Sequence, residues 1–373
     1  MKRFSLFIAI LGTMGCTDSG KSDGTYGSDD PPDSDDTGSD DSGVCAEGSG
    51  CLLAEELAFG LLSVQIPVDD DVWIVGSSPE PADGTGPAIL HYDGSEWNRF
   101  NTTTWAGAEL WWSWIGDEEA IFVGNEGLIL EMSKSDGSIQ KIDGPGEDVT
   151  FFGVWGASSD DIWAVGMTDG GDGHRALWRR QAGIWATWED PTLGIGEDKV
   201  IYFKVHGTTA DDVWFAGNGG RTLHWNGSSL TRVATDAETP TSTAPLLTID
   251  ASPAQPVVVG GIGNGLILEY DGSIWQDRSP EFQPGFNGVC SGAGDQWAVG
   301  QQGSRARRQA DGTWISDMDS GFRTLSYDDW HGCAIAPNGD LWAVGGRIAQ
   351  RPLSSGIIGF QGSSLPSELP TDW

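Results

Sequence analysis

The side chains best able to do chemistry in this sequence are histidines, cysteines and a large excess of carboxylates. One segment brings imidazole and carboxylate groups together, with Asp169, Asp172 and His174 close in sequence. These groups offer oxygen and nitrogen ligands to a metal ion, and calcium is the cofactor to consider. A solvated loop is the favoured interpretation, and we expect no cofactor, with a metal ion such as calcium as the alternative. The elements around this loop decide what it can do.

Seven short apolar runs, each ending in glycine, divide the chain into repeats of 40 to 51 residues. A period of this length is typical of the four-stranded blades of a β-propeller. The clearest copy is Gly153–Gly166, in which an acidic turn precedes Asp-Ile-Trp-Ala-Val-Gly. The runs end at Gly76, Gly124, Gly166, Gly217, Gly260, Gly300 and Gly345.

Each repeat predicts four strands: an apolar stretch, the glycine-terminated run, a third stretch, and a fourth that follows an Asp-Gly or Asn-Gly turn. We therefore expect an all-β fold, a seven-bladed β-propeller with four antiparallel strands per blade. Arg347–Arg351 and Gly356–Gln361 are expected to supply the last two strands, so that the ring closes without an N-terminal strand. Nine tryptophans at two repeated positions are expected to fill the wedges between blades: Trp73, Trp163, Trp214, Trp297 and Trp342 in the second strand, and Trp97, Trp185, Trp275 and Trp314 near the fourth.

The repeat also explains most histidines. His91 and His224 share one position in the third strand, aligned with Glu131 and Glu269, and His206 aligns with Trp155 and Cys290. Catalytic signatures such as H-E-x-x-H, G-x-S-x-G and the phosphate-binding P-loop are absent. Abundant carboxylates do not by themselves indicate a glycosidase, which needs a pair at a central cleft. We expect no enzyme, and a sialidase-like or other glycan hydrolase is the alternative.

Two stretches resemble known families. Val257–Asp277 (VVVGGIGNGLILEYDGSIWQD) resembles a kelch repeat, and Trp155–Gly166 (WGASSDDIWAVG) is similar to repeats of bacterial propeller lipoproteins. The resemblance spans residues 58 to 360. It implies a propeller fold in an exported protein and carries no catalytic residue with it.

The N-terminus predicts export. Lys2 and Arg3 precede the apolar stretch Phe4–Leu11, and residues 1–15 resemble a bacterial lipoprotein signal peptide with Cys16 as the lipidated residue. Residues 16–56 are acidic and of low complexity, which predicts a disordered tether that holds the propeller (57–362) off a membrane. Asp33–Asp41 lacks the spacing of a calcium site. Residues 363–373 are expected to form a C-terminal tail.

The other cysteines form two candidate pairs. Cys45 and Cys51 flank a short loop and predict a disulfide, as expected of an exported protein. Cys290 and Cys333 are about one repeat apart and would lie on neighbouring inner strands. A second disulfide is possible there only if their Cα atoms lie within about 7 Å, and two buried thiols are the alternative.

Charge and loop length define the expected partners. The chain has 20 Lys and Arg against 55 Asp and Glu, a net charge of −35, which excludes nucleic acid as a partner. Long loops after the second and fourth strands would emerge on one face, flanked by Trp105, Trp111 and Trp112. We expect a monomer in the bacterial cell envelope, lipid-anchored at the outer membrane or cell surface. It would bind a protein or glycan through this face, or act as a purely structural surface protein.

Overall fold

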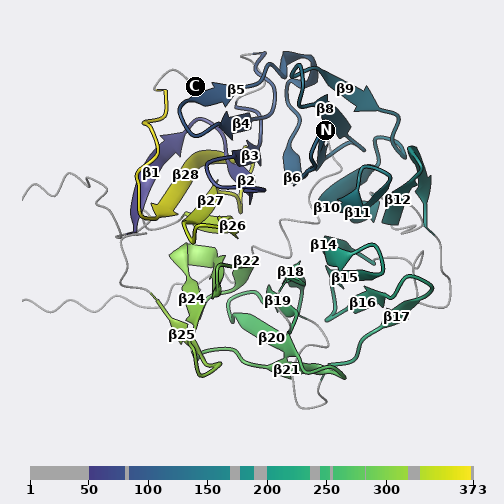
Figure 1. Ribbon diagram of the computed structural model, residues 1–373, viewed down its shortest axis with the longest axis vertical. Coiled ribbons are helices and arrows are strands. Elements are labelled where there is room, and N and C mark those ends of the chain that lie inside the picture. The colour runs from purple at the N-terminus through teal and green to yellow at the C-terminus, as the bar shows by residue number, and fades with distance from the viewer. Residues whose placement is uncertain are drawn as a thin grey trace, which may run out of the picture.

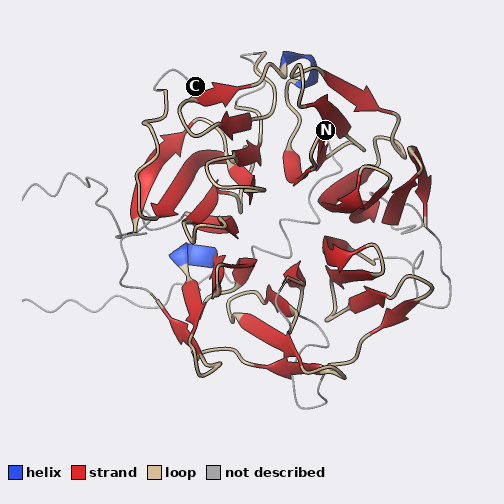
Figure 2. Ribbon diagram, in the orientation of Figure 1, coloured by secondary structure: helices blue, strands red, loops and turns tan. Residues whose placement is uncertain are grey.

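The computed structural model describes residues 50–79, 84–168, 177–188, 200–235, 244–252, 255–281, 283–317 and 328–370. These residues form seven four-stranded antiparallel sheets that stand as blades around a central axis (Figure 1). The chain is a seven-bladed β-propeller, as the repeat predicts. Strands dominate the ring, and the short 3-10 helices η2 (Thr103–Trp105) and η4 (Gln301–Gly303) lie between them (Figure 2).

In each blade the chain runs from the inner strand outwards. The first three blades comprise β2 (Leu61–Gln65), β3 (Val72–Gly76), β4 (Ile89–Tyr92), β5 (Trp97–Arg99); β6 (Leu110–Ile115), β7 (Glu119–Gly124), β8 (Ile129–Ser133), β9 (Ile139–Ile142); β10 (Val149–Ser158), β11 (Asp161–Thr168), β12 (Leu177–Gln181) and β13 (Ile184–Thr187). Blades four to six comprise β14 (Tyr202–Thr209), β15 (Asp212–Gly217), β16 (Thr222–Trp225), β17 (Leu230–Arg232); β18 (Leu246–Asp250), β19 (Val257–Gly260), β20 (Leu266–Tyr270), β21 (Trp275–Asp277); β22 (Phe286–Gly292), β23 (Asp295–Gly300), β24 (Arg305–Arg308) and β25 (Trp314–Ser316). The seventh blade contains β26 (Asp329–Ile335), β27 (Leu341–Arg347), β28 (Ser354–Gln361) and β1 (Cys51–Leu57).

The seventh blade shows that the predicted closure of the ring is wrong. The N-terminal strand β1 pairs antiparallel with β28, with Cys51 opposite Phe360, so β28 is the third strand of this blade and β1 the fourth. The predicted tether, residues 16–56, therefore overlaps a strand. The strand was not predicted because its exposed residues Glu55 and Glu56 continue the acidic composition of the preceding segment. Its apolar residues Leu53, Ala54 and Leu57 pack against the core.

Every inner strand carries a β-bulge near its start, which shifts its register against the second strand. A bulge places one extra residue against the partner strand and bends the bulged strand. The seven extra residues are Leu62, Trp111, Phe152, Phe203, Leu247, Asn287 and His331.

The bulge explains why every glycine-terminated run must end in glycine. At Gly166 an added Cβ would lie 1.9 Å from the carbonyl oxygen of Thr150, at the start of the bulged strand. At the six equivalent glycines the same distance is 2.0 to 2.3 Å. No side chain fits at such a distance. Each repeat therefore has glycine at this position because the bulged inner strand passes so close to it.

The C-terminal segment packs on the ring. Trp97 Nε1 donates to the carbonyl oxygen of Ser367 at 3.0 Å, and Leu369 contacts the core between the first and seventh blades. Among the described residues, no helix is long and apolar enough to cross a membrane.

Candidate functional site

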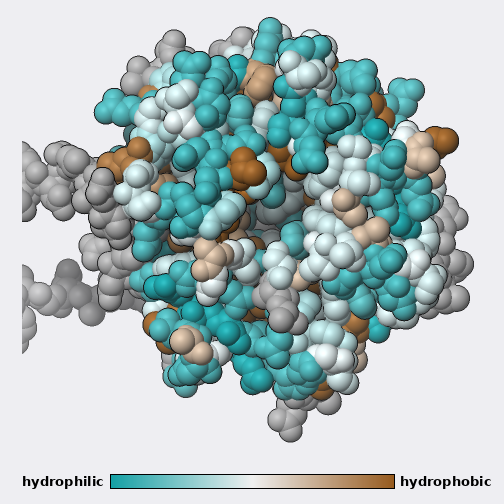
Figure 3. All heavy atoms as spheres, in the orientation of Figure 1, coloured by the Kyte–Doolittle hydropathy of each residue, from teal (hydrophilic) through white to brown (hydrophobic). Residues whose placement is uncertain are grey.

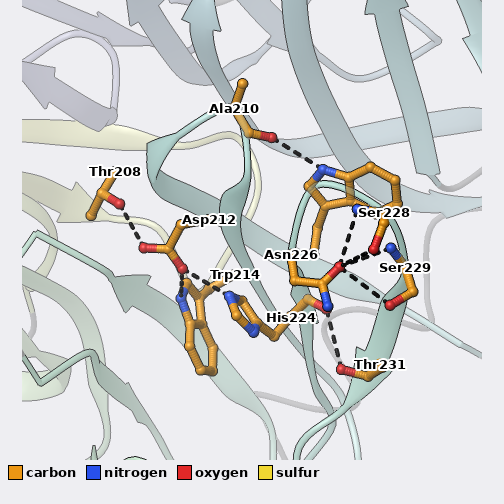
Figure 4. Close-up of polar contacts among 10 residues, drawn as sticks. Thr208, Ala210, Asp212, Trp214, His224, Asn226, Ser228, Ser229 and Thr231 are labelled. Carbon is orange, nitrogen blue, oxygen red and sulfur yellow. Dashed lines mark hydrogen bonds and ion pairs between the residues drawn. The ribbon is translucent and has the colours of Figure 1, made fainter.

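Two of the histidines at the repeated position, His91 and His224, make contacts within their own blades. In the fourth blade, Asp212 Oδ1 lies 2.8 Å from His224 Nε2 and accepts from Trp214 Nε1 at 2.9 Å, while the two rings stack with centroids 4.0 Å apart (Figure 4). Burial raises the pKa of Asp212, but hydrogen bonds from Thr208, His224 and Trp214 outweigh burial and leave that pKa below its ordinary value. The first blade repeats this arrangement with Asp71, Trp73 and His91.

Arginine takes the place of histidine in the third and sixth blades. Arg179 makes two hydrogen bonds of 2.8 Å to Asp161 and covers the ring of Trp163. Arg307 pairs with Asp295 in the same way and lies over Trp297. In the second and fifth blades this position holds glutamate. Glu131 forms an ion pair with Arg180 of the third blade, and Glu269 forms one with Arg308 of the sixth blade. The order His, Glu, Arg thus occurs twice around the ring and is explained by blade packing.

The side chains that blade packing leaves available for binding lie at the centre of the ring, where the surface is hollowed (Figure 3). Six of the seven bulge residues line one pocket, which we call the loop-face pocket: Trp111, Phe152, Phe203, Leu247, Asn287 and His331. Pro245, Ile262, Ile348 and Ala349 complete its rim. These four belong to the loops before inner strands and after second strands, so the pocket opens on the face predicted to carry binding. Its cavity volume is about 60 Å³, and about 680 Å³ when the space open to solvent is counted.

A second pocket lies at the opposite end of the channel, between the far ends of the inner strands. Its lining is more polar and includes Gln65, His206, Asp250 and Ser291. Cys290 and Cys333 also line it and are joined by a disulfide with Cα atoms 5.7 Å apart, within the reach of about 7 Å that a disulfide allows. The bridge links the inner strands β22 and β26 of neighbouring blades. We call this second pocket, at the end of the channel opposite the loop-face pocket, the turn-face pocket.

Lys204 lines both pockets. It directly follows the bulge of β14, at a position occupied by glycine in the third, sixth and seventh blades. Its Nζ donates to the carbonyl oxygen of Phe152 at 2.8 Å and lies 4.0 Å from the ring centroid of Trp112. The side chain is 4% exposed, and burial lowers its pKa to about 7.

His331 and Asp329 are the other titratable groups of the loop-face pocket. Burial and the nearby charge of Lys204 lower the pKa of His331 to about 3, so its imidazole is neutral at pH 7. Because Nδ1 then donates to the carbonyl oxygen of Leu62, Nε2 is left as an acceptor. Burial raises the pKa of Asp329 to about 6, against the hydrogen bond from the Gln302 amide and with a smaller contribution from Asp328.

The structure separates the aromatic residues predicted to bind. Trp111 and Trp112 lie on the inner strand β6 rather than in a loop, and they line the loop-face and turn-face pockets respectively. Trp105 lies on η2 and packs between the first and second blades.

The remaining predicted sites lie at or beyond the edge of the described residues. Asp169, Asp172 and His174 lie outside them, as do Cys16 and Cys45. Cys51, the predicted partner of Cys45, is disulfide-bonded. Among the residues that the structure describes, no cluster of three or more histidine, cysteine or carboxylate side chains could hold a metal ion.

Sequence reasoning missed Phe203, Lys204 and Asp329. A signal for two of them was present, because counting back from the repeat glycines Gly217 and Gly166 aligns Phe203 with Phe152, and Lys204 with Gly153. A lysine among glycines at an inner-strand position stands out once the bulge is known. Asp329 carries no comparable signal, since acidic residues are common throughout this chain.

Comparison with known proteins establishes the architecture. No protein-family model matches the sequence, and no curated protein does. Among solved structures, YCF48 bound to a D1 peptide is similar with a TM-score of 0.59 at 14% identity, over 84% of this chain and 96% of that one. YCF48 from Cyanidioschyzon merolae gives 0.59 at 12% identity, over 84% and 99%. The WD40 repeats of RRP9 give 0.59 at 9% identity, over 85% and 98%. At these identities the likeness shows the propeller fold.

Proposed function

We propose that this propeller is a non-enzymatic binding module that holds a protein ligand at the loop-face pocket. The observation that carries the proposal is the pocket itself: it is concave and mostly apolar, with a few polar groups among aromatic rings, as is typical of binding sites. Its walls come from inner strands, which hold side chains more rigidly than loops do. The peptide bound to YCF48, a propeller of similar fold, is consistent with a protein ligand.

We further propose that the protein is exported and anchored by lipid at Cys16, with the acidic segment before β1 as a spacer. The argument is the signal-like N-terminus followed directly by a low-complexity acidic stretch. Metabolic labelling with radioactive palmitate tests this proposal. Label should enter the wild-type chain and be absent from Cys16→Ala. Equal labelling of the two chains, or no labelling, would contradict the anchor.

A crosslinking pull-down from cell envelopes tests the binding site. Leu247→Trp fills the loop-face pocket with a larger ring, and Gln65→Trp does the same in the turn-face pocket as the matched control. We expect a saturable protein partner that is lost with Leu247→Trp and kept with Gln65→Trp. Loss with the control alone would move the site to the other face. If purified glycans bind instead and no protein does, the ligand class changes to glycan.

A further inference from the structure

Lys204 is a buried amine that lacks a counter-charge among the described residues. No carboxylate of the described residues forms an ion pair with it, although its side chain is almost completely buried in a strongly acidic protein. An ammonium group has three N–H donors, and the carbonyl oxygen of Phe152 accepts one of them. Burying an unpaired charge costs several kcal/mol, and an anion that binds to it recovers part of this cost.

The position of Lys204 determines what such an anion would look like. The side chain lies where the loop-face and turn-face pockets meet, inside the channel. A ligand that enters from the loop face passes the rings of Trp111, Phe152 and Phe203 before it reaches the amine. Two of these rings, Trp111 and Phe152, stand perpendicular to each other with centroids 5.2 Å apart and present apolar surface. The ligand therefore needs an apolar group next to its negative charge.

Polar groups of the same pocket suit a peptide backbone. Asn287 donates from Nδ2 to the carbonyl oxygen of Trp330 at 2.8 Å, so its side-chain oxygen can accept an N–H. Asp329 at the rim is a second acceptor, although the Gln302 amide already uses one of its oxygens. Peptide N–H groups close to a terminal carboxylate would match these acceptors.

We propose that the loop-face pocket captures the C-terminal residue of a partner protein, with its α-carboxylate on Lys204 and its apolar side chain against Trp111, Phe152 and Phe203. This inference rests on the proposed function, since it names the part of the protein ligand that enters the pocket. It makes Lys204 the specificity-determining residue, because the internal residues of a chain carry no α-carboxylate.

Fluorescence anisotropy with short labelled peptides tests the proposal. The probes are fluorescein-Gly-Gly-Gly-Phe and fluorescein-Gly-Gly-Gly-Leu, each with a free C-terminal carboxylate or a C-terminal amide. We expect the full-length protein to bind the acids at least tenfold more tightly than the amides. Lys204→Met should abolish this preference. Lys141→Met, which removes an exposed lysine of β9, should keep it.

Each other outcome overturns the proposal. Equal binding of acid and amide, no binding of either, or an undiminished preference in Lys204→Met would show that Lys204 does not read a carboxylate. Competition by 3-phenylpropanoate at the affinity of the peptide acid would assign the pocket to a free carboxylic acid instead of a protein terminus. If the peptides fail while Leu247→Trp still abolishes the pull-down, the binding module stands and this inference falls.

Discussion

Replacing Lys204 with methionine should stabilise the propeller at pH 7, although it removes two native contacts. The pKa of Lys204 falls from its ordinary value of 10.5 to about 7 on folding. A fall of this size corresponds to about 5 kcal/mol of lost stability at or below pH 7. Methionine avoids this cost but forfeits the hydrogen bond to Phe152 and the contact with the ring of Trp112, about 1 kcal/mol each. The net gain should be about 2 to 3 kcal/mol.

The sign of the effect depends on pH, and this dependence is the sharper test. Between pH 7 and pH 10.5 the unfolded chain keeps the proton on Lys204 while the folded chain releases it, so the stability of the wild type rises with pH over this window. Near pH 10 the advantage of Lys204→Met should vanish or reverse, because the wild-type amine is neutral in the folded state and still donates its hydrogen bond to the carbonyl oxygen of Phe152.

Urea unfolding followed by tryptophan fluorescence at several pH values between 6 and 10 measures this difference. Lys141→Met is the control, since Lys141 is exposed. Its unfolding free energy should differ from the wild type by a small and constant amount. Parallel pH profiles for Lys204→Met and the wild type would refute the reasoning, because they would mean that the pKa of Lys204 is the same in both states.

Three further predictions concern stability. Cys290→Ala with Cys333→Ala should lower the unfolding free energy by about 4 kcal/mol, because the disulfide closes a loop of 43 residues, and calorimetry of the double variant checks this. Arg179→Met should cost about 3 kcal/mol and Arg307→Met less than about 1 kcal/mol, since the Arg179 side chain is 8% exposed and the Arg307 side chain 44% exposed in the same bidentate arrangement. Equal losses in urea unfolding would contradict this. Deleting residues 1–57 should leave an aggregating or dimeric species in light scattering, because it exposes the edge of β28, whereas deleting 1–44, which keeps Cys45 and β1, should leave a stable monomer.

The fold could be predicted from the sequence because the residues that define the repeat are required by packing. The glycine that ends each second strand and the large rings at repeated positions follow from packing alone. Closure of the ring was missed because it depends on a pairing between Cys51 and Phe360, near opposite ends of the chain. A single strand with two exposed glutamates resembles the acidic segment that precedes it.

The candidate site was predicted only in part for a related reason. Trp111 was noticed as an aromatic residue near a long loop, and the bulge is what places it in the channel beside Phe152 and Phe203. The position of a bulge cannot be read from amino-acid composition, because the extra residues in this protein are of several different types. The role of Lys204 depends on the backbone of Phe152 in the adjacent third blade and on the ring of Trp112 in the second blade, which are three-dimensional relations.

The pairing of β1 with β28 also sets the order in which this molecule can be completed. The first strand of the ring to be synthesised has no partner until the last has been made, since almost the entire chain lies between them. Contacts of such long sequence separation form slowly. Six blades can form from neighbouring segments, while β1 has no partner and is open to pairing with other chains until β28 has been made. The acidic residues of β1 and of the segment before it would keep the unpaired β1 soluble until it pairs with β28 and closes the ring.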